Sequence, residues 1–356
     1  MPTSHMGEHD RESDQRNTAT VTAENPLTED AAAAGVPAQT VNRPLGPDDS
    51  GIHPSDVQTV SVGYARVEIY QGTLAEQTAW LHLHNRQGTF RLVYWDPPFF
   101  SGKQKAADRG SFSDRWPDLE TYLVEMDEDF ARLKTLVHPE GFLVLHCDWH
   151  ASHYLKVIGD RHFGYQNFRN EIVWHYKGRR QPARLVINSK HDNLLVWAAS
   201  SRAVMQPVYD PWDREQYVSM KRQQVHSDED GREWIWGHNG RGRARSYRIY
   251  LDEVVARGRA IDSVWDMPIV NTTAKERTGY PTQKPVALLK RIVALLTLEG
   301  DSVADLMAGS GTTGEAAALS GRDVWLGDRN PEATALIQER MARIAQQAPT
   351  HRGRIR

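Results

Sequence analysis

Apolar and polar positions along the chain divide it into short strands and longer helices. Runs of apolar residues typical of buried strands occur at 92–95, 142–146, 191–199, 302–306 and 323–327. Helices are predicted at 117–137, 151–163 and 286–298, where apolar residues recur at helical spacing. Strands that alternate with helices at these lengths indicate a parallel sheet with helical crossovers, so we expect an α/β fold.

Other segments lack such patterns. Residues 1–56 are polar and rich in Ala, Thr, Pro, Asp and Glu, and we expect a disordered acidic tail there. Residues 57–83 mix Val, Tyr and Leu and predict a strand pair or a helix against the core. Residues 100–115 carry glycines, lysines and serines and predict a mobile loop over a pocket. Residues 347–356 form a basic tail.

Length and composition narrow the class of protein. The 356 residues suffice for one large domain with an insertion. No run approaches the ~20 apolar residues of a membrane span, and no apolar stretch near the start indicates a secretory signal. The single cysteine, Cys147, excludes a disulfide framework, so we expect a reducing cytoplasm and no membrane partner. The net charge of −3 does not indicate a nucleic-acid binder, but the acidic tail masks the basic residues that follow.

The most informative segment is Asp96-Pro97-Pro98-Phe99, directly after the predicted strand 92–95. The two prolines end the strand and hold the Asp96 carboxylate and neighbouring carbonyls at its carboxyl end, where open α/β sheets bind ligands. Such an edge can accept hydrogen bonds from an exocyclic amino group while Phe99 stacks on a planar ring. The alternative is an ordinary strand-to-loop turn closed by two prolines.

A glycine-rich turn near the C-terminus is the second informative segment. It follows Asp305, precedes a predicted helix, and lies about twenty residues before Asp328, which ends the next strand. Backbone N–H groups at a helix N-terminus bind anionic groups, and an acid at this distance suits a ribose diol. The lysine of a nucleoside triphosphate loop is missing, and the match to a dinucleotide fingerprint is loose. The turn itself consists of Ala308, Gly309, Ser310, Gly311, Thr312, Thr313 and Gly314.

Two further segments are less specific. Residues 146–150 read His-Cys-Asp-Trp-His, which suggests metal ligands, but consecutive residues alternate across a strand end and do not converge. We therefore favour a pocket rim and expect no metal. The region 176–275 interleaves aromatic residues with arginines, which suits phosphate contact and base stacking; an irregular solvated insertion is the alternative. The candidate DNA-binding residues are Lys177, Arg179, Arg180, Arg241, Arg243 and Arg245.

Taken in order, these segments resemble the permuted, β-class DNA amino-methyltransferases, which methylate adenine at N6 or cytosine at N4. The family order is Asp-Pro-Pro-Phe, a basic variable insertion, Pro281-Thr282-Gln283-Lys284-Pro285, and then the glycine turn with a final acid. The resemblance covers residues 92–337. It implies a Rossmann-like, mostly parallel seven-stranded sheet with an inserted target recognition region, and S-adenosylmethionine as methyl donor, with S-adenosylhomocysteine as product.

The resemblance also implies the division of the chain and the roles of its residues. The predicted segments are a catalytic half at 57–175, a target recognition region at 176–275 containing one core strand, and a cofactor-binding half at 276–346. Asp96, Pro97, Pro98 and Phe99 would be catalytic. The cofactor-binding residues would be Asp96, Lys284 (near the cofactor carboxylate), Asp305 (ammonium), Asp328 (ribose) and the turn residues Ala308, Gly309, Ser310, Gly311, Thr312 and Thr313.

The chain departs from the family pattern at three places. Leu306-Met307 follows Asp305 where the family has Pro-Phe, so an aromatic residue beside the cofactor is lost or comes from elsewhere. Asp328 replaces the more common Glu, and Phe99 replaces the more common Tyr.

The predicted reaction is methylation of a flipped adenine in double-stranded DNA, since the cytosine-N4 members tend to carry Ser in place of Asp96. Cytosine-N4 methylation is the first alternative. Methylation of RNA or of a protein glutamine, and a non-catalytic DNA-binding protein, are the others. Cys147 is not in the Pro-Cys context that carbon-5 methylation needs. The sequence does not decide whether the chain forms a homodimer or has a cognate restriction enzyme.

Overall fold

The computed structural model describes residues 57–178, 187–238 and 246–348. The predicted tails at 1–56 and 349–356 therefore lie outside the described residues. Among the residues that are described, no helix combines the length and the apolar character that crossing a bilayer requires.

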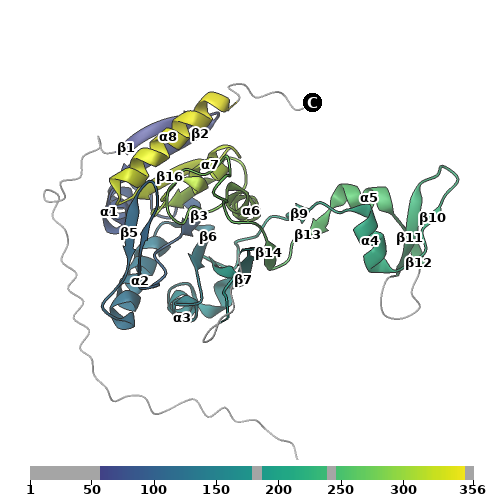
Figure 1. The fold of residues 1–356 in the computed structure, drawn as a ribbon, viewed down its shortest axis with the longest axis horizontal. Helices are drawn as coiled ribbons and strands as arrows, with labels where there is room; N and C mark the ends of the chain where they lie inside the picture. The colour runs from purple at the N-terminus through teal and green to yellow at the C-terminus, as the bar shows by residue number, and fades with distance from the viewer. Residues whose placement is uncertain (1–56, 179–186, 239–245, 349–356) are drawn as a thin grey trace, which may run out of the picture. The chain divides into compact units, whose positions relative to one another are not determined.

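A mixed, mostly parallel sheet organises the described chain (Figure 1). Its strands lie in the order β1-β2-β16-β15-β3-β6-β8-β7-β14. Five neighbouring pairs are parallel, and β1/β2, β6/β8 and β8/β7 are antiparallel. The strands are β1 (Val57–Val62), β2 (Ala65–Gln71), β3 (Phe90–Trp95), β6 (Val137–Cys147), β7 (Phe168–His175), β8 (His191–Ala198), β14 (Val264–Asp266), β15 (Ser302–Asp305) and β16 (Asp323–Asp328). The α/β class is confirmed, but nine described strands replace the expected seven because β1 and β14 extend the two edges.

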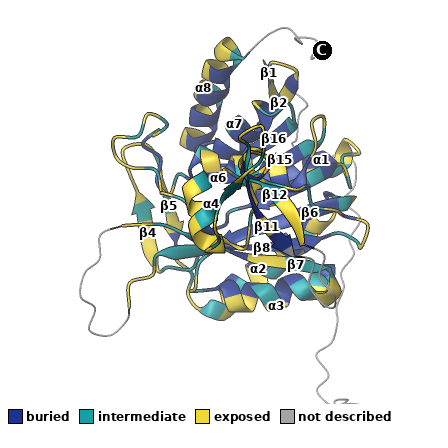
Figure 2. Ribbon diagram, turned by 90° about the vertical axis from the view of Figure 1, so that its right-hand side faces the viewer, coloured by how far each residue is buried: buried dark blue, intermediate teal, exposed yellow. Residues whose placement is uncertain are grey.

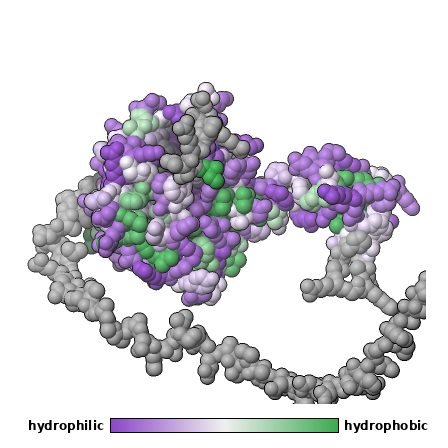
Figure 3. Space-filling model, turned by 60° about the horizontal axis from the view of Figure 1, so that its bottom comes forward, coloured by the Kyte–Doolittle hydropathy of each residue, from purple (hydrophilic) through white to green (hydrophobic). Residues whose placement is uncertain are grey.

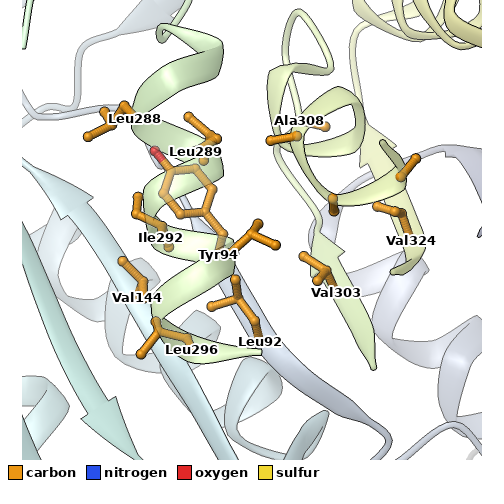
Figure 4. Packing of buried hydrophobic residues seen from close by; sticks show 14 of the residues in the cluster. Leu92, Tyr94, Val144, Leu288, Leu289, Ile292, Leu296, Val303, Ala308 and Val324 are labelled. Carbon is orange, nitrogen blue, oxygen red and sulfur yellow. The ribbon is translucent and has the colours of Figure 1, made fainter. Parts of the chain in front are cut away.

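Helices cover both faces of this sheet. Successive residues of a strand point to opposite faces, so Leu92 and Tyr94 of β3 face one apolar core while Val93 and Trp95 face another. The first core contains α6, α7 and α8, and the second contains α1, α2 and α3. Figure 4 shows Tyr94 of β3 beside Leu289 and Ile292 of α6 in the first core. The helices are α1 (Leu74–Leu83), α2 (Leu119–Lys134), α3 (Ser152–Phe163), α6 (Val286–Leu296), α7 (Thr312–Ala318) and α8 (Pro331–Gln347).

The burial pattern explains why the strand predictions succeeded. Central strands carry dark-blue buried residues and the outer faces of the helices are exposed (Figure 2). The view in Figure 3 shows a mainly hydrophilic surface with smaller hydrophobic patches. Helix starts are capped as polar residues predict: Asp118 accepts from the Thr121 amide at 2.8 Å, and Thr73 and Glu76 form a capping box on α1.

Two predicted segments differ in the structure. The segment 57–83 contains both a hairpin and a helix, β1–β2 and α1. The predicted loop at 100–115 is instead a hairpin of β4 (Lys103–Ala106) and β5 (Ser111–Asp114), whose turn uses Gly110 at φ +82°. This hairpin was missed because its strands are short and polar, so their order comes from pairing with each other and not from an apolar pattern.

The predicted recognition region contributes β8 and β14 to the large sheet and also contains smaller elements. Strands β10, β11 and β12 form a sheet, and Ile235 of β11 packs with Tyr217, Leu251 and Val254 from α4 and α5. The smaller elements are β9 (Tyr209–Asp210), α4 (Arg214–Lys221), β10 (His226–Ser227), β11 (Glu233–His238), β12 (Ser246–Tyr250), α5 (Leu251–Arg257) and β13 (Arg259–Ala260), and a short 3-10 turn spans Tyr165–Asn167.

Candidate active site

Three carboxylates stand at the carboxyl ends of three neighbouring parallel strands. Asp305 and Asp328 are the last residues of β15 and β16, and Asp96 directly follows β3. Strand β15 lies between the other two, with Asp305 in register with Tyr94 on one side and Leu326 on the other. Parallel strands place their carboxyl ends at one edge of the sheet, which is where α/β folds bind ligands.

A cavity of about 1450 Å³ joins the two predicted motifs. Asp96 of the Pro-Pro segment and Gly309 of the glycine turn both line it, although they are far apart in the sequence. Gly311 does not line it; its amide donates to the Ala308 carbonyl at 2.7 Å, and its φ of +72° begins helix α7. The predicted site residues that line the cavity are Asp96, Pro97, Pro98, Phe99, Lys284, Asp305, Ala308, Gly309, Ser310, Thr312, Thr313 and Asp328.

The Asp96 carboxylate is held by a lysine from the other half of the domain. The Lys284 ammonium donates to Oδ2 of Asp96 at 2.5 Å, and the two side chains are only 10% and 18% exposed. The same ammonium lies 5.3 Å from the centroid of the Phe99 ring. The next carbonyl, that of Pro98, accepts from the Tyr122 hydroxyl at 3.1 Å, which ties the turn to α2. Lys284 therefore contacts the predicted catalytic segment, a contact that its sequence motif did not indicate.

Asp305 is almost fully buried beside the glycine turn. Its Oδ2 accepts from the Thr313 hydroxyl at 2.6 Å and its Oδ1 from the Met307 amide at 3.2 Å. Burial raises the pKa of Asp305 to about 7; the Thr313 hydrogen bond opposes the rise and the charge of Asp96 adds to it. The group therefore titrates near neutral pH and its ionised form would gain from a cationic partner.

Asp328 holds the turn from the other side. Its Oδ2 accepts from the Gly309 amide at 2.9 Å and its Oδ1 from the Asn330 amide at 2.8 Å. Burial raises the pKa of Asp328, and these two backbone hydrogen bonds oppose the rise. Because Gly309 has φ +50° and donates to Asp328, the glycine turn and the end of β16 form one unit.

An aromatic side chain does stand beside the turn, although Leu306-Met307 replaces the family's Pro-Phe. Tyr280 lines the cavity, and a Cβ on Gly309 would lie 3.1 Å from Cε1 of its ring. Sequence reasoning quoted Tyr280 only as the start of the segment that ends at Pro285. Its place is decided by packing against Ala333 and Leu336 of α8, which no local pattern predicts.

The histidines at 146 and 150 are engaged with carboxylates. His146 Nε2 lies 3.2 Å from Asp192 Oδ2, and His150 Nδ1 lies 2.8 Å from Asp148 Oδ1. No group of side chains in the described ranges has the composition and proximity that a metal ion needs. The preference for a pocket rim agrees with the cavity, which Asp148 lines. Sequence reasoning missed Asp192 and Tyr176 in the same wall, because they come from β8 and from the residue after β7.

The predicted DNA-binding residues fall mostly outside the described residues. This applies to Arg179, Arg180, Arg241, Arg243 and Arg245. Lys177 is described and exposed, directly after Tyr176 of the cavity wall. In the small sheet, the Arg248 guanidinium lies 4.8 Å from the Trp234 ring, and Trp236 is 41% exposed. The aromatic and cationic residues of this region are thus adjacent in space as well as interleaved in sequence.

Comparisons with known proteins agree with this geometry. A family model described as DNA methylase matches residues 90–339. The DNA adenine methyltransferase YhdJ of Escherichia coli (strain K12) is 52% identical over 60 residues, which are 17% of this chain and 20% of YhdJ. The Type II methyltransferase M.HpaI of Haemophilus parainfluenzae is 35% identical over 226 residues, 64% of this chain and 60% of that protein. The matched segments thus span less than two thirds of these relatives' length.

One solved structure is a DNA modification methylase from Thermus thermophilus, TTHA0409, complexed with S-adenosyl-L-methionine. It matches with a TM-score of 0.48 and 20% identity, covering 78% of this chain and 93% of that chain.

Proposed function

We propose that this chain, which belongs to the N6/N4 DNA methylase family matched over residues 90–339, transfers a methyl group from S-adenosylmethionine to the N6 amino group of adenine in double-stranded DNA. The observation that carries the proposal is the shared cavity, in which Asp96 and the carboxylates of Asp305 and Asp328 face one space. A methyl donor and an acceptor base must meet in such a space for direct transfer.

The cavity fits the cofactor in charge and in hydrogen-bonding groups. S-adenosylmethionine carries a sulfonium, an ammonium, a carboxylate and a ribose diol, and no phosphate. When bound it supplies an electrophilic methyl group. Asp305 would face the ammonium, directly or through water, and the two ribose hydroxyls would donate to Asp328. Amides of the turn at 308–313 would bind the carboxylate, as N–H groups at a helix N-terminus do.

Asp96 prepares the target amino group for attack. The amino nitrogen of adenine is flat because its lone pair is delocalised into the ring. Lys284 occupies Oδ2 of Asp96, which leaves Oδ1 to accept one amino hydrogen, and the Pro97 carbonyl accepts the other. These two bonds pull the nitrogen toward a tetrahedral geometry and localise its lone pair. Phe99 stacks on the base.

The target base must leave the duplex to reach this edge. A paired adenine uses its amino group in the base pair, so the enzyme flips it out at a cost of a few kcal/mol. The recognition region at 176–275 would bind the surrounding DNA through Lys177 and the arginines predicted from the sequence, because guanidinium and ammonium groups neutralise phosphates. A homodimer and a cognate restriction enzyme are compatible with the Type II relatives and remain open proposals.

Adenine is favoured over cytosine by two observations. The tetrapeptide begins with Asp96, which the adenine members of the family carry more often than the cytosine members. The relative with 52% identity over 60 residues is named as a DNA adenine methyltransferase. Since both targets are exocyclic amino groups on planar rings, cytosine N4 is the alternative within the same site.

Mass spectrometry of nucleosides tests the proposal directly. Unmethylated DNA incubated with the purified protein and S-adenosylmethionine should yield N6-methyladenine, and an Asp96→Ala variant should yield none. N4-methylcytosine in place of N6-methyladenine would overturn the choice of base. A folded protein that binds the cofactor but leaves varied-sequence genomic DNA unmodified would overturn the activity.

A further inference from the structure

His146 is a buried titratable side chain that the proposed reaction does not use. It lies near the end of β6 and is 0% exposed. Its Nδ1 is 2.6 Å from the Tyr94 hydroxyl on β3, and its Nε2 is 3.2 Å from Oδ2 of Asp192 on β8. The other oxygen of Asp192 accepts from the Tyr176 hydroxyl at 3.0 Å. The imidazole thus connects three neighbouring strands of the sheet through both ring nitrogens.

The hydrogen bonds have one consistent direction. Burial raises the pKa of Tyr94 well above its usual value, with the charges of Asp96, Asp305 and Asp192 adding to the rise, so the Tyr94 hydroxyl keeps its proton. Burial also acts to raise the pKa of Asp192, but His146, Lys284 and Tyr176 hold that pKa below its usual value, so Asp192 is a carboxylate. An imidazole with its proton on Nε2 then accepts from Tyr94 and donates to Asp192.

The flat side of this imidazole faces the catalytic segment. The ring centroids of His146 and Phe99 are 5.8 Å apart with 27° between the planes, whereas Trp174 meets His146 edge-on at 5.6 Å and 81°. Phe99, Trp174, Tyr176 and Asp192 line the cavity, but His146 lies behind them. A side chain that is fixed at both nitrogens and buried on all sides cannot easily yield to a neighbouring ring.

We propose that His146 is a positioning residue that sets the tilt of Phe99 and so the stacking of the target base, an inference that rests on the proposed function. If the imidazole is removed, a space opens behind Phe99 into which its ring can tip, away from the base. Because His146 also holds Asp192, and Asp192 holds Tyr176, the same imidazole fixes the floor and one wall of the cavity relative to each other.

Two substitutions separate positioning from stability. His146→Gln removes the flat ring but keeps an amide donor that can reach Asp192. His146→Phe keeps a flat ring but leaves the Tyr94 hydroxyl and Asp192 without this partner. We expect His146→Gln to lower kcat/KM for DNA about tenfold, since aromatic contacts of this kind are worth up to that factor, with cofactor affinity and melting temperature little changed. His146→Phe should do the reverse, lowering the melting temperature more than activity.

A double-mutant cycle shows whether His146 acts through Phe99. In a Phe99→Ala background, His146→Gln should change kcat/KM by no more than about twofold. His150→Gln is the matched control, because His150 also pairs with a carboxylate from the same segment but stacks on Trp149 and not on Phe99. Its activity should equal that of the unmodified protein.

A crystal structure of His146→Gln gives a result that does not depend on methylation. Phe99 should tip toward the vacated space; an unmoved Phe99 ring would overturn the inference even if the enzyme is active. Equal tenfold losses with and without Phe99, or parallel losses of activity and stability in both His146 variants, would overturn it as well. If the unmodified protein and His150→Gln methylate no DNA, the proposed function fails, while the position of Phe99 still decides this inference.

Discussion

The ammonium of Lys284 lies 2.5 Å from Oδ2 of Asp96, although 188 positions separate them in the sequence. The contact joins the segment predicted to bind the cofactor to the segment predicted to bind the base. One oxygen of Asp96 is therefore engaged before any substrate arrives, and the other faces the reaction alone.

Replacing Asp96 should stop methyl transfer but not cofactor binding. Asp96→Ala removes the carboxylate that accepts from the target amino group, so we expect a loss of kcat of about 1,000-fold or more. Cofactor affinity, measured by calorimetry, should change only a few-fold because Asp305 and Asp328 remain. Asp108→Ala, at an exposed acid, is the control. Normal methylation by Asp96→Ala would contradict the assigned role.

Replacing Lys284 separates its two proposed roles. If Lys284 mainly orients Asp96, Lys284→Met should lower kcat by about 10–100-fold, the worth of a hydrogen bond to a charged group, and leave cofactor affinity nearly unchanged. If it mainly binds the cofactor carboxylate, cofactor affinity should fall and kcat at saturation should survive. We expect the first result. Lys290→Met on the exposed side of α6 is the matched control, and single-turnover kinetics with calorimetry distinguishes the two roles.

Cofactor binding should weaken in mild acid. The pKa of Asp305 is raised to about 7 in the free protein, so the carboxylate is ionised above that pH and protonated below it. A cationic ligand needs the ionised form, and its apparent affinity should fall by up to about tenfold per pH unit below pH 7. Asp305→Asn should bind weakly at all pH values and lose most of this dependence. An unchanged pH profile in that variant would assign the titration to another group.

The glycine turn should not tolerate a side chain at Gly309. Gly309→Ala must place a Cβ 3.1 Å from the Tyr280 ring at φ +50°, so the turn or the tyrosine has to move. We expect cofactor affinity to fall about tenfold or more, measured by equilibrium binding. Gly300→Ala is an informative control because it has φ +88° with no atom within 4 Å of the added Cβ. It should cost stability and leave cofactor binding intact.

Gln77 should stabilise the edge of the site from within the core. It is fully buried, its Nε2 donates to the Gly72 and Leu306 carbonyls at 2.9 Å each, and its Oε1 accepts from the Trp325 indole at 3.1 Å. Gln77→Leu keeps the size but leaves these groups without partners, at roughly 1–3 kcal/mol for each. Chemical denaturation should show this loss, whereas Gln87→Leu at an exposed site should change the free energy of unfolding by less than about 0.5 kcal/mol.

Local sequence patterns determined much of the fold. Apolar runs at 92–95 and 142–146 predicted the cores of β3 and β6, because buried parallel strands need no alternation. Proline and glycine at fixed positions predicted the turns after Asp96 and Asp305, since few other residues suit those backbone conformations. Because these requirements are local, the residues of both motifs could be named from the sequence alone.

Tertiary structure decided which of those residues meet. No local rule links Lys284 to Asp96, Tyr280 to Gly309, or His146 to Phe99, because each pair depends on the order of strands in the sheet and on packing between distant segments. The hairpin at 103–114 and the edge strands β1 and β14 were likewise set by pairing and not by their own composition. The sequence by itself thus determined the chemical groups of the site, and the strand order determined the distances at which those groups can act.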